Sequence, residues 1–283
     1  MILVTGATGT AGGEVVRQLI AAGHPVRALV RPGSAALRLG SGAEIAVGDA
    51  GRPETLGAAL RGVERMYLLL PMTPALRQQD AGIIAAAQSA GVGHVVKHSN
   101  MGAQDEAGTT MQRRHRAGEM LLEKSGMAWT FIRPTGYMTN ALGWAGMIKS
   151  QGAVYAPGGD GRLAVVDPRD IAAVAVAALT EPGHEGRAYD VTGPEALSAA
   201  DQVKTISDEI GKPVSYIDIP ESAAREQMIS TGMPAEIAEA LTEFMTDVRA
   251  GRSATVSDAV MKVTGRPART FAAWVHENAA AFR

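Results

Sequence analysis

The sequence predicts an α/β protein built on a doubly wound parallel sheet, and three observations support this fold class. Short apolar runs alternate with helix-like segments over the first two-thirds of the 283-residue chain. Several of those segments end at a glycine, such as Gly23, Gly91 and Gly126, which is typical of a helix C-terminus. The first apolar run leads directly into a glycine-rich turn. Apolar strands that alternate with helices favour a parallel sheet covered on both faces.

The expected elements of this sheet follow one another with short turns between them. Strands are expected over residues 1–4, 26–30, 45–47, 66–70, 92–98 and 129–133. Helices are expected between them, over residues 12–22, 53–60, 75–90 and 111–125. Right-handed crossovers between such strands give a Rossmann-like order.

Beyond residue 134 the regular alternation breaks. Further elements are expected as helices over 137–149, 168–179, 199–210, 222–230, 234–250 and 267–281, and as strands over 189–192 and 214–219. We therefore expect residues 1–134, completed by about 153–192, to form a Rossmann-like domain. Residues 135–152 and 193–283 would form a smaller, mostly helical C-terminal lobe.

Composition excludes several classes of function. The chain has a net charge of −2, so we expect no nucleic-acid partner. It has no cysteine, which rules out disulfides and thiolate metal sites. His94 and His98 share a strand face, but a third ligand is not evident, so we expect no metal. With neither a signal-type segment nor a membrane-length apolar run, we expect a cytoplasmic monomer or homodimer that avoids membranes.

The turn after the first strand reads VTGATGTAGG and contains the pattern Gly6-x-x-Gly9-x-x-Gly12. A strand that enters a tight glycine turn and opens a helix presents free N–H groups and a positive dipole end to an anion. We therefore predict a dinucleotide pyrophosphate here, because the glycines allow the turn and the close approach of ligand and helix. The alternative is an ordinary loop of small residues. The residues expected to wrap the pyrophosphate are Gly6, Thr8, Gly9, Thr10 and Ala11.

Ligands of doubly wound sheets lie beyond the carboxyl ends of the strands, so the residues after each strand are informative. Arg31 follows the second strand, where dinucleotide folds often carry an acidic residue for the ribose 2′-hydroxyl. A guanidinium at this position pairs with a 2′-phosphate and so favours NADP over NAD. The alternative is a solvated loop arginine.

The next two strands end in candidate adenosine and linker contacts. Asp49 follows the third strand and could accept the adenine amino group, or alternatively cap the helix entered at Pro53. Leu70 and Pro71 follow the fourth strand and would line the path between adenine and nicotinamide.

The nicotinamide ring and the substrate are expected to meet after the fifth and sixth strands. Ser99 and Asn100 follow the fifth strand. The residues after the sixth strand are Pro134, Thr135, Gly136 and Tyr137.

Three segments together resemble the NmrA-like branch of the atypical short-chain dehydrogenase/reductases. They are TGATGTAGG, GDAGRPETLGAALRGVERMYLL and HRAGEMLLEKSGMAWTFIRPTGYMTN. The resemblance implies a Rossmann-like domain that binds NADP and a smaller lobe that binds substrate. That branch includes NAD(P)H-dependent quinone, azo-dye and triphenylmethane-dye reductases, and also catalytically silent redox-sensing regulators.

The resemblance also assigns residues. The family's cofactor positions fall on the glycine turn, on Arg31 and on residues 134–137. His115-x-x-x-Glu119 matches a pattern of the dye- and quinone-reducing members, and Tyr137 matches a tyrosine that lines their substrate pocket.

The Tyr-x-x-x-Lys dyad of ordinary short-chain dehydrogenases is absent. The residue four positions after each tyrosine is Pro71, Ala141, Gly159, Gly193 or Pro220. Without this acid/base pair, alcohol–ketone chemistry is not expected, whereas quinones and conjugated dyes accept hydride by orientation alone. We therefore expect an NADPH-dependent reductase of a small quinone-like acceptor, with Tyr137, His115 and Asn100 at the reacting end. The alternative is a non-catalytic NADP(H)-sensing regulator that binds a partner protein.

Overall fold

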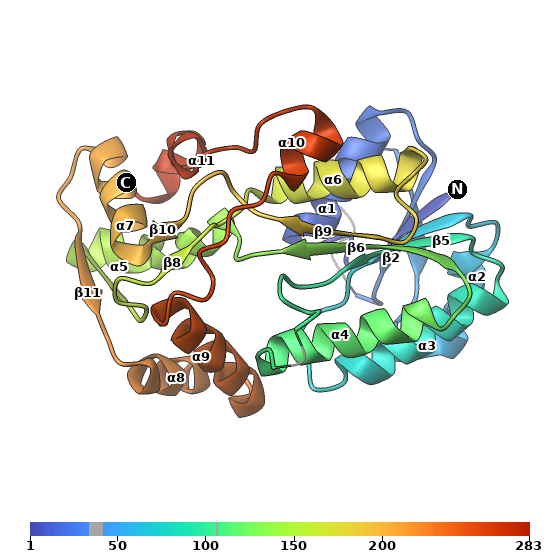
Figure 1. Ribbon diagram of the computed structural model, residues 1–283, viewed down its shortest axis with the longest axis horizontal. Coiled ribbons are helices and arrows are strands. Elements are labelled where there is room, and N and C mark those ends of the chain that lie inside the picture. Colours follow the sequence, from blue (N-terminus) through green and yellow to red (C-terminus); the bar gives the residue numbers. More distant parts are fainter. Residues whose placement is uncertain (34–41, 106) are drawn as a thin grey trace. The chain divides into compact units, whose positions relative to one another are not determined.

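The computed structural model describes residues 1–33, 42–105 and 107–283. The chain divides into two compact units (Figure 1). Unit 1 comprises Met1–Gly108, Gln112–Pro134 and Pro168–Asp190, and unit 2 comprises Thr109–Met111, Thr135–Asp167 and Val191–Arg283. Residues 153–167, which we expected in the first domain, belong to unit 2. The division of cofactor and substrate binding between the two parts stays a prediction.

Unit 1 is built on a seven-stranded sheet with the strand order β3-β2-β1-β4-β5-β6-β9. Its strands are β1 (Ile2–Val4), β2 (Val26–Val30), β3 (Ala43–Val47), β4 (Arg65–Leu68), β5 (His94–His98), β6 (Ala128–Pro134) and β9 (Arg187–Val191). Every pairing from β3 across to β6 is parallel. The order reverses at β1, which lies between β2 and β4, and this reversal is the switch point of a doubly wound sheet. The predicted fold class is therefore confirmed.

Helices cover both faces of this sheet (Figure 1). Helices α1 (Thr10–Ala21) and α6 (Pro168–Thr180) lie on one face, and α3 (Leu76–Ser89) and α4 (Thr110–Glu123) lie on the other. Helix α6 is rich in buried alanine and valine, which lets it pack closely on α1 and on the sheet. The expected helix over residues 53–60 is split into a 3₁₀ turn, η2 (Pro53–Thr55), and a short α2 (Gly57–Leu60).

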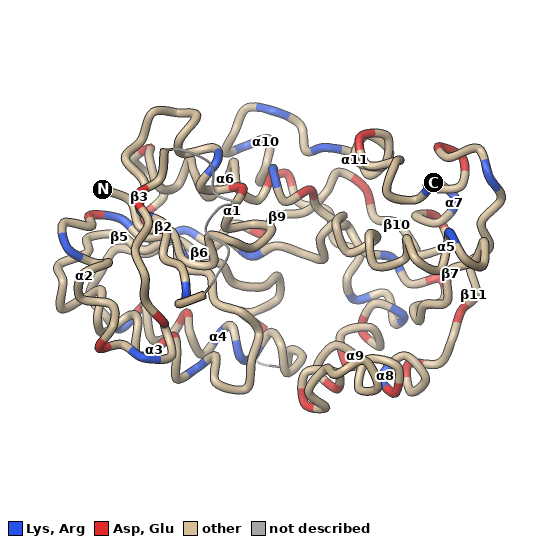
Figure 2. The backbone as a smooth tube through the Cα atoms, turned by 180° about the vertical axis from the view of Figure 1, so that it is seen from behind, with Lys and Arg blue, Asp and Glu red and all other residues tan. Residues whose placement is uncertain are grey.

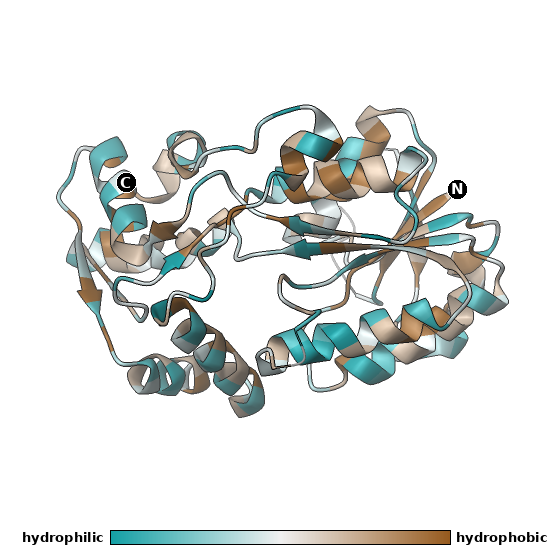
Figure 3. Cartoon of the chain, in the orientation of Figure 1, coloured by the Kyte–Doolittle hydropathy of each residue, from teal (hydrophilic) through white to brown (hydrophobic). Residues whose placement is uncertain are grey.

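The core of unit 1 lies between the sheet and these helices. Hydrophobic residues concentrate on the strands (Figure 3). Leu3, Met66, Val95 and Phe131 come from four neighbouring strands and are all buried in one cluster. Burial of this apolar surface is the main favourable contribution to folding, and it holds the strand ends in fixed register.

Unit 2 is more helical but contains two small sheets. Its helical segments are η3 (Met138–Trp144), α5 (Ala145–Gln151), α7 (Ala199–Ile210), α8 (Glu221–Ser230), α9 (Ala235–Arg249), α10 (Ala259–Thr264), α11 (Phe271–Asn278) and η4 (Ala279–Ala281). Strand β11 (Ser215–Asp218) pairs in parallel with β7 (Ala153–Ala156), and β10 (Leu197–Ser198) pairs antiparallel with β8 (Arg162–Leu163).

In unit 2 one sequence prediction is wrong in its bounds, and two elements were not predicted. The helix expected over 267–281 begins only at Phe271, because the Thr270 hydroxyl caps it by accepting the Ala273 N–H at 3.2 Å. Strand β7 and helix α10 were not expected, since each is short and lacks a clear hydrophobic period.

Basic and acidic residues are interspersed along the described backbone of each unit (Figure 2). Among the described helices, none combines the length and the apolar character that a membrane crossing requires. The expected lack of a nucleic-acid partner, the oligomeric state and the cytoplasmic location stay predictions.

Candidate functional site

The glycine turn connects β1 to α1 at the switch point. Gly6 has φ = +62°, a conformation that residues with a side chain rarely adopt. A Cβ on Gly12 would lie 2.3 Å from the Gly6 carbonyl oxygen, so only glycine lets α1 pack so closely on the turn. The Gly9 N–H donates to the Gly6 oxygen at 2.9 Å and closes the turn. The glycines at positions 6 and 12 are therefore required by the backbone path itself.

The first turn of α1 is electrostatically suited to an anion. Gly9 is the N-cap, no side chain of the described residues caps the helix, and the first turn contains no acidic residue. The N–H groups at a helix start have no acceptor within the helix, and they sit at its positive dipole end. Thr8, Gly9 and Thr10 are exposed, whereas the Ala11 side chain is buried and can contribute only its backbone.

Thr5 supports this turn, a role that was not predicted from the sequence. Its hydroxyl donates to the Leu69 carbonyl oxygen and accepts the Leu69 N–H, both at 2.8 Å, and Thr5 is 2% exposed. These bonds join the ends of β1 and β4, so the turn lies beside the segment that leads to Leu70 and Pro71. Leu70 is buried and Pro71 is exposed. A polar residue between a buried strand and Gly6 was the available signal.

The predicted site residues after β2 and β3 differ in their surroundings: Arg31 is exposed, whereas the Asp49 side chain accepts a hydrogen bond. Arg31 follows β2 directly and is exposed. One carboxylate oxygen of Asp49 accepts the Gly51 N–H at 2.8 Å and so belongs to a tight turn. The alternative that Asp49 caps the next helix is wrong, because the N-cap of η2 is Arg52 and it has no side-chain cap. Adenine recognition by Asp49 stays a prediction.

The ends of β5 and β6 are held together by backbone hydrogen bonds. The Ser99 N–H donates to the Ile132 oxygen at 2.7 Å, and the Met101 N–H donates to the Pro134 oxygen at 3.0 Å. Pairing therefore continues past the end of β5. Pro134 is the last residue of β6 rather than the first residue after it. The structure thus places Ser99 and Pro134 side by side, at the ends of the adjacent strands β5 and β6, at the carboxyl edge of the sheet.

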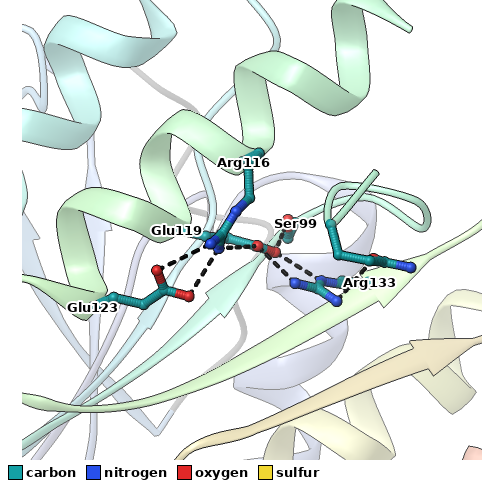
Figure 4. Close-up of polar contacts among 6 residues, drawn as sticks. Ser99, Arg116, Glu119, Glu123 and Arg133 are labelled. Atoms are coloured by element: carbon teal, nitrogen blue, oxygen red, sulfur yellow. Dashed lines mark hydrogen bonds and ion pairs between the residues drawn. The ribbon is translucent and has the colours of Figure 1, made fainter. Parts of the chain in front are cut away.

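Glu119 lies on the buried face of α4 and binds side chains from both of these strand ends (Figure 4). Its carboxylate accepts the Ser99 hydroxyl at 2.6 Å and two N–H groups of Arg133 at 2.7 and 2.8 Å. Arg116, one turn earlier on α4, also contacts it at 3.2 Å and binds Glu123. The predicted cofactor residue Ser99 therefore donates its hydroxyl hydrogen to Glu119, and the hydroxyl oxygen can only accept from a ligand.

His115 lies on the same buried face of α4 as Glu119, as expected for positions four residues apart on a helix. It is 8% exposed, and its Nδ1 has no hydrogen-bond partner among the described residues. Burial, followed by the nearby Lys97 ammonium, lowers the pKa of His115 well below its ordinary value. The imidazole is consequently neutral at pH 7 and cannot supply a proton as a cation.

Near His115, a buried ion pair joins helix α3 to strand β5 and is bordered by helix α4. The Lys97 ammonium lies 2.6 Å from one Asp80 oxygen, and both side chains are almost completely buried. A Cβ on Gly118 would lie 2.1 Å from the other Asp80 oxygen, so glycine at this position leaves room for the pair. His98 accepts or donates a 2.6 Å bond with the Tyr67 hydroxyl, and burial lowers its pKa to about 3.

Thr135, Gly136 and Tyr137 belong to unit 2. The Thr135 hydroxyl donates to the Ala164 oxygen at 2.5 Å, and Gly136 accepts the Val166 N–H at 2.9 Å. Tyr137 is half-buried, and burial raises the pKa of its phenol, which therefore stays protonated and can donate a hydrogen bond. Asn100 and His115 belong to unit 1, so a site shared by the three stays a prediction.

A metal site is not built into the described parts of the chain. No group of three or more His, Asp or Glu side chains in residues 1–33, 42–105 and 107–283 is arranged to hold a metal ion. His94 instead bonds the Thr130 hydroxyl at 2.9 Å.

Comparison with known proteins gives a consistent result. The model of the NmrA-like family matches residues 1–264. An NAD(P)H azoreductase of Xenophilus azovorans is 44% identical and covers 100% of this chain and 99% of its own. A (4-alkanoyl-5-oxo-2,5-dihydrofuran-3-yl)methyl phosphate reductase of Streptomyces griseus is also 44% identical, with 100% and 99% covered. The structure of an Escherichia coli NADPH-dependent quinone oxidoreductase in complex with NADPH superimposes with a TM-score of 0.88, at 29% identity over 98% and 99% of the two chains.

Proposed function

Because the chain belongs to the NmrA-like family, we propose that it is an NADPH-dependent reductase that transfers hydride to a quinone-like or other conjugated small molecule. The coarse class is established: the chain is an NAD(P)H-dependent oxidoreductase, since full-length relatives at 44% identity are reductases. The acceptor and the residues that bind it are the proposed part.

The residues of the glycine turn fit a dinucleotide. Gly6 and Gly12 let the turn pack closely against the start of α1. That start has no side-chain cap among the described residues, so its N–H groups and positive dipole end are available to an anion. Gly6, Thr8, Gly9, Thr10 and Ala11 would hold the pyrophosphate, and Arg31 the 2′-phosphate. Asp49 would hold adenine, with Leu70 and Pro71 along the linker. When bound, NADPH supplies the hydride.

The protonation states of the candidate catalytic residues support an acceptor that needs little acid/base help. Tyr137 is a protonated phenol, because burial raises its pKa, and it can donate a hydrogen bond to an acceptor oxygen or nitrogen. His115 is neutral, because burial lowers its pKa. Neither group is poised as a charged acid or base at pH 7, so orientation of an electrophilic acceptor by Tyr137, His115 and Asn100 carries the chemistry, with protons from water.

The names of the relatives suggest what such an acceptor has in common. An azo group, a quinone and an acylated dihydrofuranone all place an electron-poor double bond in conjugation with another. Hydride addition to such a system gives a delocalised anion, which water can protonate. We therefore expect conjugated acceptors, and not isolated ketones, to be reduced.

The direct test is NADPH oxidation with a panel of quinones, azo dyes and α,β-unsaturated lactones, next to a saturated ketone of similar size. We expect turnover with at least one conjugated acceptor and none with the ketone. If no acceptor raises NADPH oxidation above background, the reductase proposal is wrong. Binding of NADPH without turnover would then favour the non-catalytic sensor, which the absent Tyr-x-x-x-Lys dyad also permits.

A further inference from the structure

We propose that Glu119 is a positioning residue that holds the end of β5 and the loop after it against the end of β6. The inference rests on the proposed function, because these two segments, which contain Ser99, Asn100 and Pro134, are the ones expected to surround the nicotinamide. In this proposal Glu119 does not contact the nicotinamide ring. It fixes the position of the two segments that contact the ring.

The contacts of Glu119 come from three elements of unit 1. Its carboxylate is fully buried and lies on α4, Ser99 follows β5, and Arg133 is in β6. One carboxylate oxygen accepts the Ser99 hydroxyl and the Arg133 Nε–H, and the other accepts Nη2 of Arg133 and Nη1 of Arg116. Four donors thus occupy one buried carboxylate (Figure 4). A paired geometry of this kind between arginine and a carboxylate fixes orientation as well as distance.

The same arrangement reaches the loop after β5 by a second route. Nη1 of Arg133 donates to the Gln104 side-chain oxygen at 2.8 Å, in the loop between β5 and α4. The loop also pairs with β6 through the Met101 N–H. Glu119 therefore orients Arg133, and Arg133 in turn holds the loop. Loss of the carboxylate would free Ser99 on one side and the Arg133 guanidinium on the other.

The adenosine half of the cofactor is expected at a different place, on the glycine turn and Arg31. Among the described residues, the hydrogen bonds of Glu119 go to Ser99, Arg116 and Arg133, and none of them involves that turn. Glu119 should consequently affect how the nicotinamide is oriented and leave adenosine binding unchanged. A residue that merely stabilises the fold would affect both halves together.

The experiment compares Glu119→Gln with two other variants of the full chain. Ser99→Ala removes one donor and keeps the buried ion pair, so it tests the inference even where Glu119→Gln unfolds. Glu123→Gln is the matched control, since Glu123 also binds Arg116 but contacts neither Ser99 nor Arg133 among the described residues. Three quantities are measured for folded protein: the affinity for 2′,5′-ADP, kcat, and the deuterium retained in NADP⁺ from (4R)- and (4S)-[4-²H]NADPH.

For Glu119→Gln we expect an unchanged 2′,5′-ADP affinity, a kcat reduced about tenfold or more, and loss of the strict choice between the two C4 hydrogens, because small displacements of reacting atoms are costly in rate. Ser99→Ala should change in the same direction by less, and Glu123→Gln should match the wild type. Wild-type kcat and stereospecificity in Glu119→Gln, or a parallel loss of 2′,5′-ADP binding, would overturn the inference.

Failure of the proposed function has a different signature. A wild-type protein that binds NADPH without turnover contradicts the reductase, and the inference is then tested by the fluorescence of the bound nicotinamide. We expect Glu119→Gln to shift that fluorescence toward free NADPH at unchanged 2′,5′-ADP affinity. Fluorescence identical to that of the wild type would overturn the inference independently of catalysis.

Discussion

The glycine turn after β1 and the polar core beneath α4 are both parts of unit 1, yet they are specified in opposite ways. The turn is determined mainly by residues that have no side chain, and the contacts of Gly9 and Gly12 with the Gly6 carbonyl oxygen lie within seven positions, from Gly6 to Gly12. The polar core is made of long charged side chains from separate elements, such as Asp80 with Lys97 and Glu119 with Arg133. A site formed by the backbone can be specified by a short sequence motif. A site formed by side chains arises only when the fold brings distant residues together.

The difference also predicts how each region fails. An added methyl group in the turn should cause a steric clash, while the loss of one charged partner in the core should leave another charge buried without compensation. We expect the loss of a buried charge partner to destabilise the protein more than a clash in the turn.

Lys97→Met should be the most damaging of these substitutions. Asp80 is fully buried, and its second oxygen already has no hydrogen-bond partner among the described residues. We expect the free energy of unfolding, measured with urea, to fall by about 3–5 kcal/mol, as is typical when one partner of a buried ion pair is removed. The double variant Asp80→Leu/Lys97→Met should recover most of this loss. If the free energy of unfolding of Lys97→Met lies within about 1 kcal/mol of the wild-type value, Lys97 does not stabilise the buried Asp80 carboxylate.

Gly12→Ala should damage the turn by overpacking. The new Cβ would meet the Gly6 carbonyl oxygen at 2.3 Å, so the backbone of the turn must move. We expect the free energy of unfolding to fall by about 1–3 kcal/mol, the usual cost of overpacking, together with a raised KM for NADPH. Gly57→Ala is the control, since its Cβ would have no atom within 4 Å. Equal behaviour of the two variants would contradict the role given to Gly12.

Mild acid should destabilise the polar core. Burial lowers the pKa of His98 to about 3, against an ordinary 6.5, so the unfolded chain binds the proton more readily than the folded chain between these values. The contribution of neutral His98 to the free energy of unfolding is therefore present above pH 6.5 and is lost as the pH falls. At pH 5 the loss from this residue is about 2 kcal/mol. His98→Asn should show a flatter decline in urea unfolding between pH 7 and 5. Parallel curves for variant and wild type would rule out this contribution.

Thr5→Val should have the smallest effect of the four. The variant keeps the shape of the side chain but loses both bonds to Leu69, so the partly buried N–H and carbonyl oxygen of Leu69 lose these partners. We expect the free energy of unfolding to fall by about 1–2 kcal/mol, because each bond contributes about 1 kcal/mol net. Thr5→Ser retains the hydroxyl and should lose less. Greater stability of Thr5→Val than of Thr5→Ser would contradict the assigned bonds.

The sequence was informative where physical causes are local. Residues 26–30 and 199–210 have the predicted bounds as β2 and α7, because an apolar run and a Ser198 capping box with Asp201 are both short-range signals. The glycine turn was predicted for the same reason. The NmrA-like family and the NADP cofactor, expected from motif resemblance, are confirmed by the comparisons.

Sequence reasoning failed where causes are non-local. The Glu119–Arg133 contact spans 14 positions and joins a helix to a strand, and nothing in the helix periodicity of 110–123 indicates it. Asp49 is a different case, because its carboxylate accepts the Gly51 N–H two positions further on, in a local turn that competes with the helix cap. The Glu119–Arg133 contact depends on how the chain folds back on itself, which a motif does not contain.

We propose that NADPH binds on the glycine turn with its 2′-phosphate on Arg31, and the Arg31→Ala variant removes the side chain on which this depends. Kinetics with NADPH and NADH, beside the exposed control Arg61→Ala, separate this phosphate contact from a general loss of charge. We predict that kcat/KM for NADPH falls about tenfold or more, as expected for loss of a charge-assisted bond, while that for NADH changes about twofold at most. Equal losses for the two cofactors, or no loss for either, would contradict the account.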